Sequence, residues 1–186
     1  MLEKLYFILK HKFKKNSKIS FNSYLKNTTN ISIGTNSKIH SNCSLDASSS
    51  GNIKIGNNVT LNRYVYLNAF KGNIMIGNNS EINNYTIING TGKVTIGEDV
   101  LIGPNVQIIS YQHKYNNRNI LIKKQGIYKK EIIIENDVWI GASAIIMAGI
   151  KISKGSVIGA GAVVTKNVKE NEVVVGIPAK KMSCRE

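Results

Sequence analysis

The sequence predicts an all-β solenoid built from six-residue repeats, and three observations carry this prediction. Between residues 134 and 164 an aliphatic residue recurs at every sixth position without a slip. A second small or aliphatic residue follows each of them after four positions, and the same register recurs upstream in groups of three. Neither the helical period of about 3.6 nor the strand period of about 2 gives this spacing, whereas a six-residue period is typical of a hexapeptide β-helix.

The positions of the repeated aliphatic residues show which residues belong to each coil. In the regular stretch the first positions are Ile134, Ile140, Ile146, Ile152, Ile158 and Val164, and the second positions are Val138, Ala144, Ile150, Ser156, Ala162 and Val168. The upstream groups are Ile33, Ile39 and Leu45; Ile55, Leu61 and Leu67; Ile76, Ile82 and Ile88; and Ile96, Ile102 and Ile108. Three hexads make one triangular coil of 18 residues, so we expect each group to form a coil that buries its aliphatic residues against the next coil.

The coils differ in length at one corner. The first residues of successive groups are 22, 21 and 20 residues apart, so small loops bulge between groups. Between Ile96 and Ile134 the separation is 38, and subtracting one coil of 18 leaves an insertion of 20 residues, at 114–133. A corner can release such a loop without leaving sheet hydrogen bonds unmade.

The two ends differ from the repeat. We expect a basic amphipathic cap and lead-in at 1–30, the β-helix at 31–175 with the loop 114–133 inserted, and a C-terminal tail at 176–186 that Gly176 and Pro178 separate from the last strand. Residues 1–18 predict a helix with Leu2, Leu5, Tyr6, Leu9 and Phe13 on one side, interspersed with Lys4, Lys10, Lys14 and Lys15. Two interpretations stay open: a cap packed on the first coil, or a basic helix in peripheral contact with an anionic membrane.

The composition sets further bounds. The 186 residues are 42% hydrophobic and 19% charged with a net charge of +14, which indicates one globular domain. The lysines are scattered and no nucleic-acid motif is present, so we expect phosphate-bearing ligands and no nucleic acid as partner. The apolar cluster at residues 5–9 is too short for a signal-peptide core, and we expect a cytoplasmic protein, with attachment to the inner face of the membrane as the alternative. Cys43 and Cys184 predict neither a disulfide framework nor a metal site.

One long motif identifies a family. The stretch IENDVWIGASAIIMAGIKISKGSVIGAGAVVTKNV, followed by VVVGIPAKK, resembles the hexapeptide-repeat acyltransferases, and among them the galactoside, maltose and capsule or lipopolysaccharide O-acetyltransferases. The likeness covers residues 50–182. It implies a left-handed parallel β-helix, which is an exception to the right-handed crossover rule. It also implies a homotrimer with active sites between neighbouring subunits, and acetyl-CoA as the acetyl donor, with no metal required.

The repeat breaks within IISYQHKYNN, residues 108–117, and the resemblance makes His113 the catalytic histidine. Acetyl transfer to a hydroxyl requires a base that takes the proton as the oxygen attacks the thioester. Imidazole titrates near neutral pH and can return that proton to the departing thiolate. The long loop would then cover a neighbour's groove and exclude water. No carboxylate that would orient His113 stands beside it, and His11 and His40 are interpreted as ordinary residues.

The resemblance assigns the acetyl-CoA contacts to Trp139, Ala142, Ala160, Thr165, Lys166 and Lys180. The backbone N–H of Ala142 is the expected oxyanion donor, and the small Ala160 leaves room for the pantetheine arm. Thr165 and Lys166 match positions near the nucleotide. Trp139 stands by the acyl arm or at the trimer seam, with a buried packing residue as the alternative.

Phosphate recognition departs from the family pattern at two positions. Lys180 stands where the family has an arginine that meets a CoA phosphate, and lysine supplies the charge without the bidentate fork. A second family arginine is Ser183 here, and Arg185 or Lys181 are the candidates to replace it.

The acceptor side is assigned to the segment INNYTII. Asn83 and Asn84 both match the asparagine that relatives place against the acceptor sugar, and an amide suits a sugar because it donates and accepts hydrogen bonds. The alternative is that these asparagines merely occupy a turn.

We therefore expect an acetyl-CoA-dependent O-acetyltransferase that modifies a sugar hydroxyl in surface polysaccharide biosynthesis. The first alternative is N-acetylation of an amino sugar nucleotide on the same scaffold. A non-catalytic solenoid binding protein is a more distant one. A zinc enzyme of the carbonic-anhydrase type would need three histidine ligands, and only His113 lies in the relevant coils.

Overall fold

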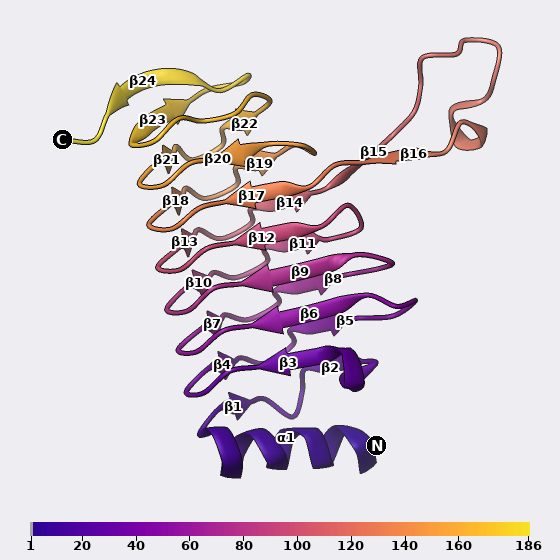
Figure 1. Cartoon of the computed structure of the whole chain (residues 1–186), viewed down its shortest axis with the longest axis vertical. Coiled ribbons are helices and arrows are strands. Elements are labelled where there is room, and N and C mark those ends of the chain that lie inside the picture. Colours follow the sequence, from indigo (N-terminus) through magenta and orange to yellow (C-terminus); the bar gives the residue numbers. More distant parts are fainter. Residues whose placement is uncertain (1) are drawn as a thin grey trace.

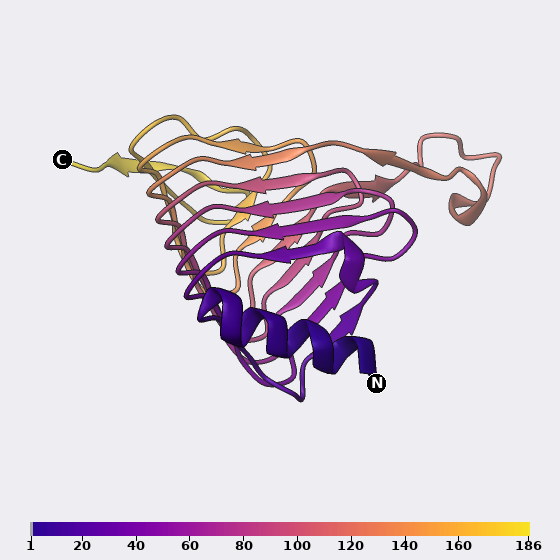
Figure 2. The ribbon, with the colours of Figure 1, turned by 60° about the horizontal axis from the view of Figure 1, so that its bottom comes forward.

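A computed structural model describes residues 2–186, with the side chains of residues 3 and 12–14 outside the described part. Helix α1 (Leu2–Lys15) lies across one end of a stack of coils, and the chain then climbs the stack coil by coil to its C-terminal end (Figure 1). Three parallel sheets form the sides of a triangular prism, which Figure 2 shows from its lower end. The all-β solenoid that the sequence predicts is thereby confirmed.

Each coil contributes one short strand to each side. Sheet A contains β1 (Lys18–Ile19), β4 (Lys38–Ile39), β7 (Thr60–Leu61), β10 (Glu81–Ile82), β13 (Leu101–Ile102), β18 (Trp139–Ile140), β21 (Val157–Ile158), β23 (Glu172–Val175) and β24 (Lys180–Cys184). Sheet B contains β2 (Tyr24–Lys26), β5 (Ser44–Asp46), β8 (Tyr66–Asn68), β11 (Ile87–Asn89), β14 (Gln107–Ile109), β19 (Ile145–Ile146) and β22 (Val163–Val164). Sheet C contains β3 (Ile31–Ile33), β6 (Asn52–Ile55), β9 (Asn73–Ile76), β12 (Val94–Ile96), β17 (Ile132–Ile134) and β20 (Lys151–Ile152).

The predicted register is the observed one. On sheet A, Ile82 is in register with Leu61 below it and with Ile102 above it. The aliphatic residue of each hexad is buried, and Leu61, Ile82 and Ile102 are all 0% exposed. A strand of two or three residues therefore positions one inward aliphatic side chain, and stacking these residues gives a continuous core along the prism axis.

The stack begins earlier than the residue-31 boundary that the sequence predicts. Lys18 and Ile19 of β1 already pair with β4, and Leu25 of β2 pairs with Leu45 of β5. The first coil is therefore formed by β1, β2 and β3, with the short 3₁₀ turn η1 (Thr28–Asn30) at one corner. A lead-in loop longer than a hexad separates Leu25 from Ile33, and for that reason the strict register first becomes visible at Ile33.

The insertion leaves the stack as an arm. Strands β15 (Tyr111–His113) and β16 (Ile127–Lys129) pair antiparallel, and the 3₁₀ turn η2 (Ile122–Lys124) lies in the loop beyond them. The arm projects from the corner between sheets B and C (Figure 2). The sequence prediction 114–133 differs at both ends, because the arm strands start at Tyr111 and β17 re-enters the stack at Ile132. The cause is that the insertion begins as a two-stranded extension of the coil rather than as a loop.

Helix α1 packs with a different face from the one that the sequence predicts. Phe7 and His11 are buried and Ile8 packs against the core. The expected packing stripe is instead exposed, with relative exposures of 81% for Leu2, 40% for Leu5, 70% for Tyr6 and 41% for Leu9, while Phe13 and Lys14 fall outside the described side chains. The helix therefore carries two apolar arcs, and the one that the hydrophobic pattern emphasises faces away from the coils.

The opposite end closes with a strand pair. β23 pairs in parallel with β21, and β24 folds back antiparallel along β23 (Figure 1). Among the described residues, no helix has both the length and the apolar character that crossing a bilayer requires.

Candidate active site

One corner of the prism stacks several of the predicted site residues in a single line. The backbone N–H of Tyr85 donates to the carbonyl of Arg63 (3.2 Å), and each coil repeats this bond to the coil below. These bonds define a corner column, between sheets A and B, made of Ser41, Arg63, Asn84, Pro104, Ala142 and Ala160. Asn84 lies two coils below Ala142, a rise of roughly 10 Å at the usual spacing of stacked strands.

The corner turn has a constant local geometry. The residue after each column position adopts a left-handed conformation, as Asn105 (φ 57°) and Ser143 (φ 60°) do. In the upper coils the residue before the column position is glycine, because the corners stack closely there. A Cβ on Gly103 would lie 2.7 Å from the Ala142 nitrogen, and one on Gly141 would lie 2.6 Å from the Ala160 nitrogen. The upper corner therefore has little side-chain cover, which leaves backbone accessible to a ligand.

The two candidate asparagines have different surroundings. The Asn83 amide is engaged within the stack: its Oδ1 accepts from Asn62 (3.0 Å) and its Nδ2 donates to the carbonyl of Ile102 (3.2 Å). Asn84 is exposed, and none of the hydrogen bonds among the described side chains involves its amide. Asn84 is thus the better-placed residue for a ligand, and Asn83 supports the corner.

The upper end of the stack gathers three predicted cofactor residues. Thr165, Lys166 and Lys180 line one cavity of about 280 Å³. Lys181 lines the same cavity, and its Nζ lies 3.6 Å from a Glu172 carboxylate oxygen. This cavity offers several cationic and hydroxyl groups to a phosphate-bearing ligand.

The two candidates for the missing arginine are separated by the structure. The Arg185 guanidinium is held at the corner between sheets C and A, where it donates to an Asp137 carboxylate oxygen (3.0 Å) and to the carbonyl of Gly155 (3.1 Å). Arg185 is therefore already occupied, whereas Lys181 shares a cavity with Lys180. Of the two candidates, only Lys181 lies where it can supplement Lys180.

Trp139 lies on the outer surface of sheet A. Its side chain is 55% exposed, and it stands in register between Leu101 and Val157 of the neighbouring strands. The interpretation of Trp139 as a buried packing residue is therefore wrong for this chain. Leu101 is also 51% exposed, so together these side chains make an apolar patch on sheet A.

His113 stands at the base of the arm, as the last residue of β15. It pairs in register with Ile127 of β16, and its side chain is exposed. The Tyr111 ring is edge-on to the imidazole, with centroids 6.3 Å apart. Among the described residues, no hydrogen bond joins the imidazole to another side chain or to a carbonyl.

The chain does not bring His113 to the corner column. Asn84 precedes β11, while His113 follows β14, which pairs in parallel with β11. The two residues therefore lie beyond opposite ends of the strands of sheet B, roughly 20 Å or more apart at about 3.3 Å per residue. A site that uses both needs two copies of the chain.

The loop of the arm is internally braced and has an apolar surface. Gln125 Nε2 donates to the carbonyls of Asn117 (2.8 Å) and Ile120 (2.7 Å), which fixes the loop against its own backbone. Four large apolar side chains are nevertheless exposed: Tyr115 at 67%, Ile120 at 44%, Leu121 at 69% and Ile122 at 57%. An exposed apolar surface on a protruding arm is typical of an interaction surface.

Three residues beside Asn84 were missed by sequence reasoning. Arg63 precedes Asn84 in the corner column, and Tyr64 and Tyr85 follow the two column residues in left-handed conformations (φ 63° and 62°). The tyrosine rings stack with centroids 4.9 Å apart and are 46% and 57% exposed. A bulky residue in this conformation costs roughly 1–2 kcal/mol. The sequence contained a signal for this, because neighbouring coils place Asn42 and Asn105 at the left-handed position that Tyr64 and Tyr85 occupy here.

Comparison with known proteins gives a family model and relatives that match most of the chain. A model described as the hexapeptide repeat of succinyl-transferase matches residues 131–166. The Escherichia coli K12 protein WbbJ, provisionally named as a lipopolysaccharide biosynthesis O-acetyl transferase, is 32% identical over 93% of this chain and 82% of its own length. The Escherichia coli dTDP-4-amino-4,6-dideoxy-D-glucose acyltransferase is 33% identical over 72% of each chain.

Other matches are shorter or structural. The chain spans only about two fifths of the length of several curated relatives, such as the galactoside O-acetyltransferase of Lactococcus lactis, which is 41% identical over 40% of its own length. Among solved structures, a hexapeptide-repeat acetyltransferase of Vibrio cholerae in complex with acetyl coenzyme A superposes with a TM-score of 0.64 at 30% identity. That match covers 69% of this chain and 68% of the other.

Proposed function

The chain belongs to the hexapeptide-repeat acyltransferases, and from this we propose that it transfers an acetyl group from acetyl-CoA to a sugar hydroxyl, with His113 as the general base. The observation that carries the proposal is the corner column, in which Ala142 and Ala160 stand above Asn84 in one line. We propose that the acetyl-bearing arm lies along the upper column and that Asn84 binds the acceptor sugar.

The reaction needs few groups. The His113 imidazole takes the proton of the acceptor hydroxyl as that oxygen attacks the thioester carbonyl. The negative charge that develops on the carbonyl oxygen is met by the backbone N–H of Ala142. The intermediate then collapses with release of the CoA thiolate, and the imidazolium returns its proton to that sulfur. No side-chain hydroxyl is available from Ala142, so the backbone donor carries this role alone.

The same proposal requires at least two copies of the chain, and we propose a homotrimer with shared sites. His113 of one copy would reach the corner column of its neighbour, because within one chain His113 and the column lie at opposite ends of the strands of sheet B. The exposed apolar side chains of the arm and the patch around Trp139 and Leu101 are the surfaces that such an assembly would cover. Light scattering should give three copies per particle, and a monomer with full activity would contradict the shared site.

For the acceptor we propose a sugar of surface polysaccharide biosynthesis. The relative WbbJ carries that role in its name and matches over 82% of its length. Exposed tyrosines beside Asn84 support a sugar ligand, since aromatic rings present an apolar face with a polar edge. N-acetylation of an amino sugar nucleotide is the second candidate, and the dTDP-amino-sugar acyltransferase match favours it.

One experiment separates these acceptors. Purified protein with acetyl-CoA would be offered free sugars, nucleotide sugars, nucleotide amino sugars and glycan fragments, and mass spectrometry would locate the acetyl group. The proposal expects an ester on a hydroxyl. An amide formed on an amino sugar nucleotide would establish the second candidate, and no turnover with any member of the panel would contradict both.

The exposed stripe of α1 favours peripheral contact with an anionic membrane, which we propose as a second property of this end of the molecule. Leu2, Leu5, Tyr6 and Leu9 are exposed on a helix whose Lys10 is also exposed, whereas Lys4 donates to the carbonyl of Phe21 at 2.7 Å. Such a helix can place its apolar side chains among lipid headgroups while lysines meet the anionic surface. Co-sedimentation with vesicles that contain phosphatidylglycerol should be strong for the wild type and lost in Leu5→Asp/Leu9→Asp. Equal sedimentation of both proteins would exclude the helix as the contact.

A further inference from the structure

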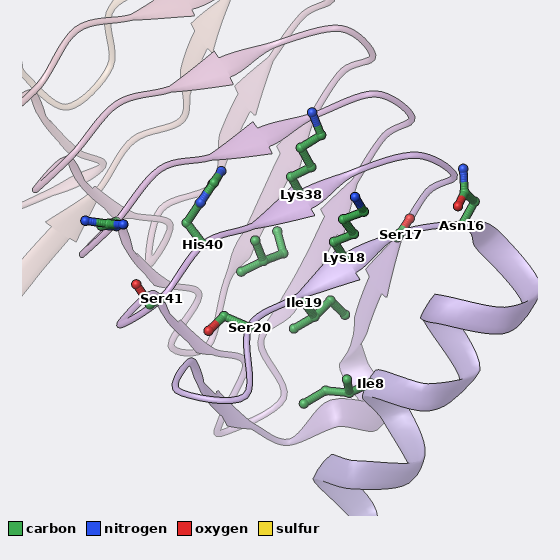
Figure 3. A pocket seen from close by; sticks show the side chains of 11 residues that line it. Ile8, Asn16, Ser17, Lys18, Ile19, Ser20, Lys38, His40 and Ser41 are labelled. Atoms are coloured by element: carbon green, nitrogen blue, oxygen red, sulfur yellow. The ribbon is translucent and has the colours of Figure 1, made fainter.

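A cavity lies at the lower end of the stack, away from the proposed acetyl-CoA contacts. It has a volume of about 730 Å³ and lies where α1 meets the first strands of sheet A. In Figure 3, Ile8 of α1 points toward Ile19 of β1, and the side chains of Lys18, Lys38 and His40 point together to the other side of their strands.

Both apolar and basic residues line this cavity. Lys18, Lys38 and Arg63 contribute three cationic groups, His40 adds an imidazole, and none of the lining residues is acidic. Five cations elsewhere among the described residues have a carboxylate partner, for example Lys93 with Glu131 at 2.8 Å and Lys151 with Glu135 at 2.7 Å. No ion pair between described side chains involves a cation of this cavity.

Two of these cations lie directly opposite each other on neighbouring strands. Lys18 and Lys38 are directly in register on the adjacent strands β1 and β4, and like charges at such positions are destabilising. The hydroxyl of Ser41, which makes no side-chain hydrogen bond within the described part, lies in the same lining. Ammonium, guanidinium and hydroxyl donors around one cavity match the oxygen atoms of a phosphate group.

The position of Arg63 links this cavity to the acceptor. Arg63 lines the cavity and also precedes Asn84 in the corner column. The two residues are one coil apart, a rise of about 4.8 Å, which is close to the width of a sugar ring. A sugar that contacts Asn84 would therefore direct its substituent at the lower end toward Arg63 and Lys38.

We propose that this basal cavity binds the diphosphate of the acceptor, so that the acetyl group is transferred to a sugar diphosphate rather than to a free sugar. The placement of the sugar rests on the proposed function, whereas the binding of the diphosphate does not. Nucleotide-linked and lipid-linked sugars share this group. The exposed apolar stripe of α1 lies on the helix that borders the cavity, which is compatible with a lipid-linked source.

The test is calorimetric titration of the full chain with three probes: inorganic pyrophosphate, uridine diphosphate and a short prenyl diphosphate. Saturating CoA would be present, so that the upper phosphate cavity is filled. We expect saturable binding, weakened at least about tenfold by Lys38→Glu and by Arg63→Glu, because each variant removes a charge-assisted contact and adds repulsion. Tighter binding of the prenyl probe or of the nucleotide than of pyrophosphate identifies the source, and equal binding means that the diphosphate alone is recognised.

The matched control is Lys54→Glu. Lys54 is an exposed, outward-facing strand residue like Lys38, but it lies on sheet C and outside the cavity. Its affinity for the probes should stay within about twofold of the wild type, because distant surface charges are screened. Absence of saturable binding in the wild type, or equal losses in Lys54→Glu and Lys38→Glu, would overturn the proposal. Binding of CoA alone, measured first, reports on the proposed function separately.

Discussion

His113 and Asn84 lie beyond opposite ends of the strands of sheet B, His113 at the base of the arm and Asn84 in the corner column. Parallel pairing of β11 with β14 fixes this separation, because Asn84 precedes the first strand and His113 follows the second. A rigid stack of coils cannot bend so that His113 and Asn84 of one chain come together. The proposed chemistry therefore depends on assembly, and each part of it can be tested alone.

Acetyl-CoA affinity should depend on the cations of the upper cavity. Charge reversal at Lys166 or Lys180, which line one cavity with Thr165, should weaken acetyl-CoA binding by about 1–3 kcal/mol through loss of charge-assisted bonds to phosphate. Calorimetry measures this directly. Arg185→Glu is the control for phosphate recognition, since Arg185 is engaged with Asp137 instead. Unchanged affinity in both lysine variants would place the nucleotide elsewhere.

Space above the corner column should matter for the pantetheine arm. Ala160 is exposed, so Ala160→Trp should leave the coil intact while filling the path of the arm. We expect normal thermal unfolding, together with a loss of acetyl-CoA affinity of at least about tenfold, because a large side chain cannot be accommodated against the backbone. Ala160→Ser should behave like the wild type. Retained affinity in the tryptophan variant would show that the arm follows another route.

Stability at the lower end should fall in mild acid. Burial lowers the pKa of His11, whose Nδ1–H donates to the carbonyl of Phe7 at 2.8 Å. The folded chain thus keeps His11 neutral at pH values where the unfolded chain is protonated, so this stability is present above about pH 6.5 and is lost as the pH falls toward the folded pKa.

Thermal unfolding at about pH 7.5 and about pH 5.5 would measure this effect. The difference in Tm between the two conditions should shrink in His11→Gln and persist in His40→Gln, because His40 is exposed. An unaltered pH dependence in His11→Gln would assign it to other groups.

The coils could be read from the sequence because each hexad repeats one local rule. An inward aliphatic at every sixth residue specifies strand, face and register together, and Ile82 and Ile102 are paired as the spacing predicts. The helix face could not be read in this way. Phe7 and His11 contact the first coil although the apolar pattern favours Leu2, Leu5 and Tyr6, because the packing partner of an end helix is not encoded in its own period.

Some residues of the candidate site could likewise be predicted from the repeat, and others could not. The motif around Ala142 and Ala160 is part of the repeat, so its position follows from the register. Arg63 and the basal cavity were not identified, because scattered lysines give no periodic signal and only the fold brings Lys18, Lys38 and Arg63 together. The assignment of His113 stays a prediction, since it rests on the resemblance and on the exposed position at the arm.

His113 as the base makes a kinetic prediction. His113→Ala should lower the rate by about 10²–10⁴ while leaving assembly and acetyl-CoA affinity intact. The side chain is exposed and outside the stack, so stability should barely change. His113→Asn should resemble alanine, because an amide cannot carry the proton. Near-wild-type turnover in His113→Ala with the true acceptor would contradict the assignment.

Complementation between two impaired variants tests the shared site most directly. His113→Ala removes the base, and Ala160→Trp blocks the corner column of the copy that carries it, so each protein alone should be far less active than the wild type when acetyl-CoA is not saturating. After unfolding and refolding together in equal amounts, random assortment in a trimer with head-to-tail interfaces should restore activity to about a quarter of the wild-type level, because one interface in four then pairs an intact histidine with an intact column. A refolded mixture that forms mixed trimers but shows no activity would contradict a site built from two copies of this chain.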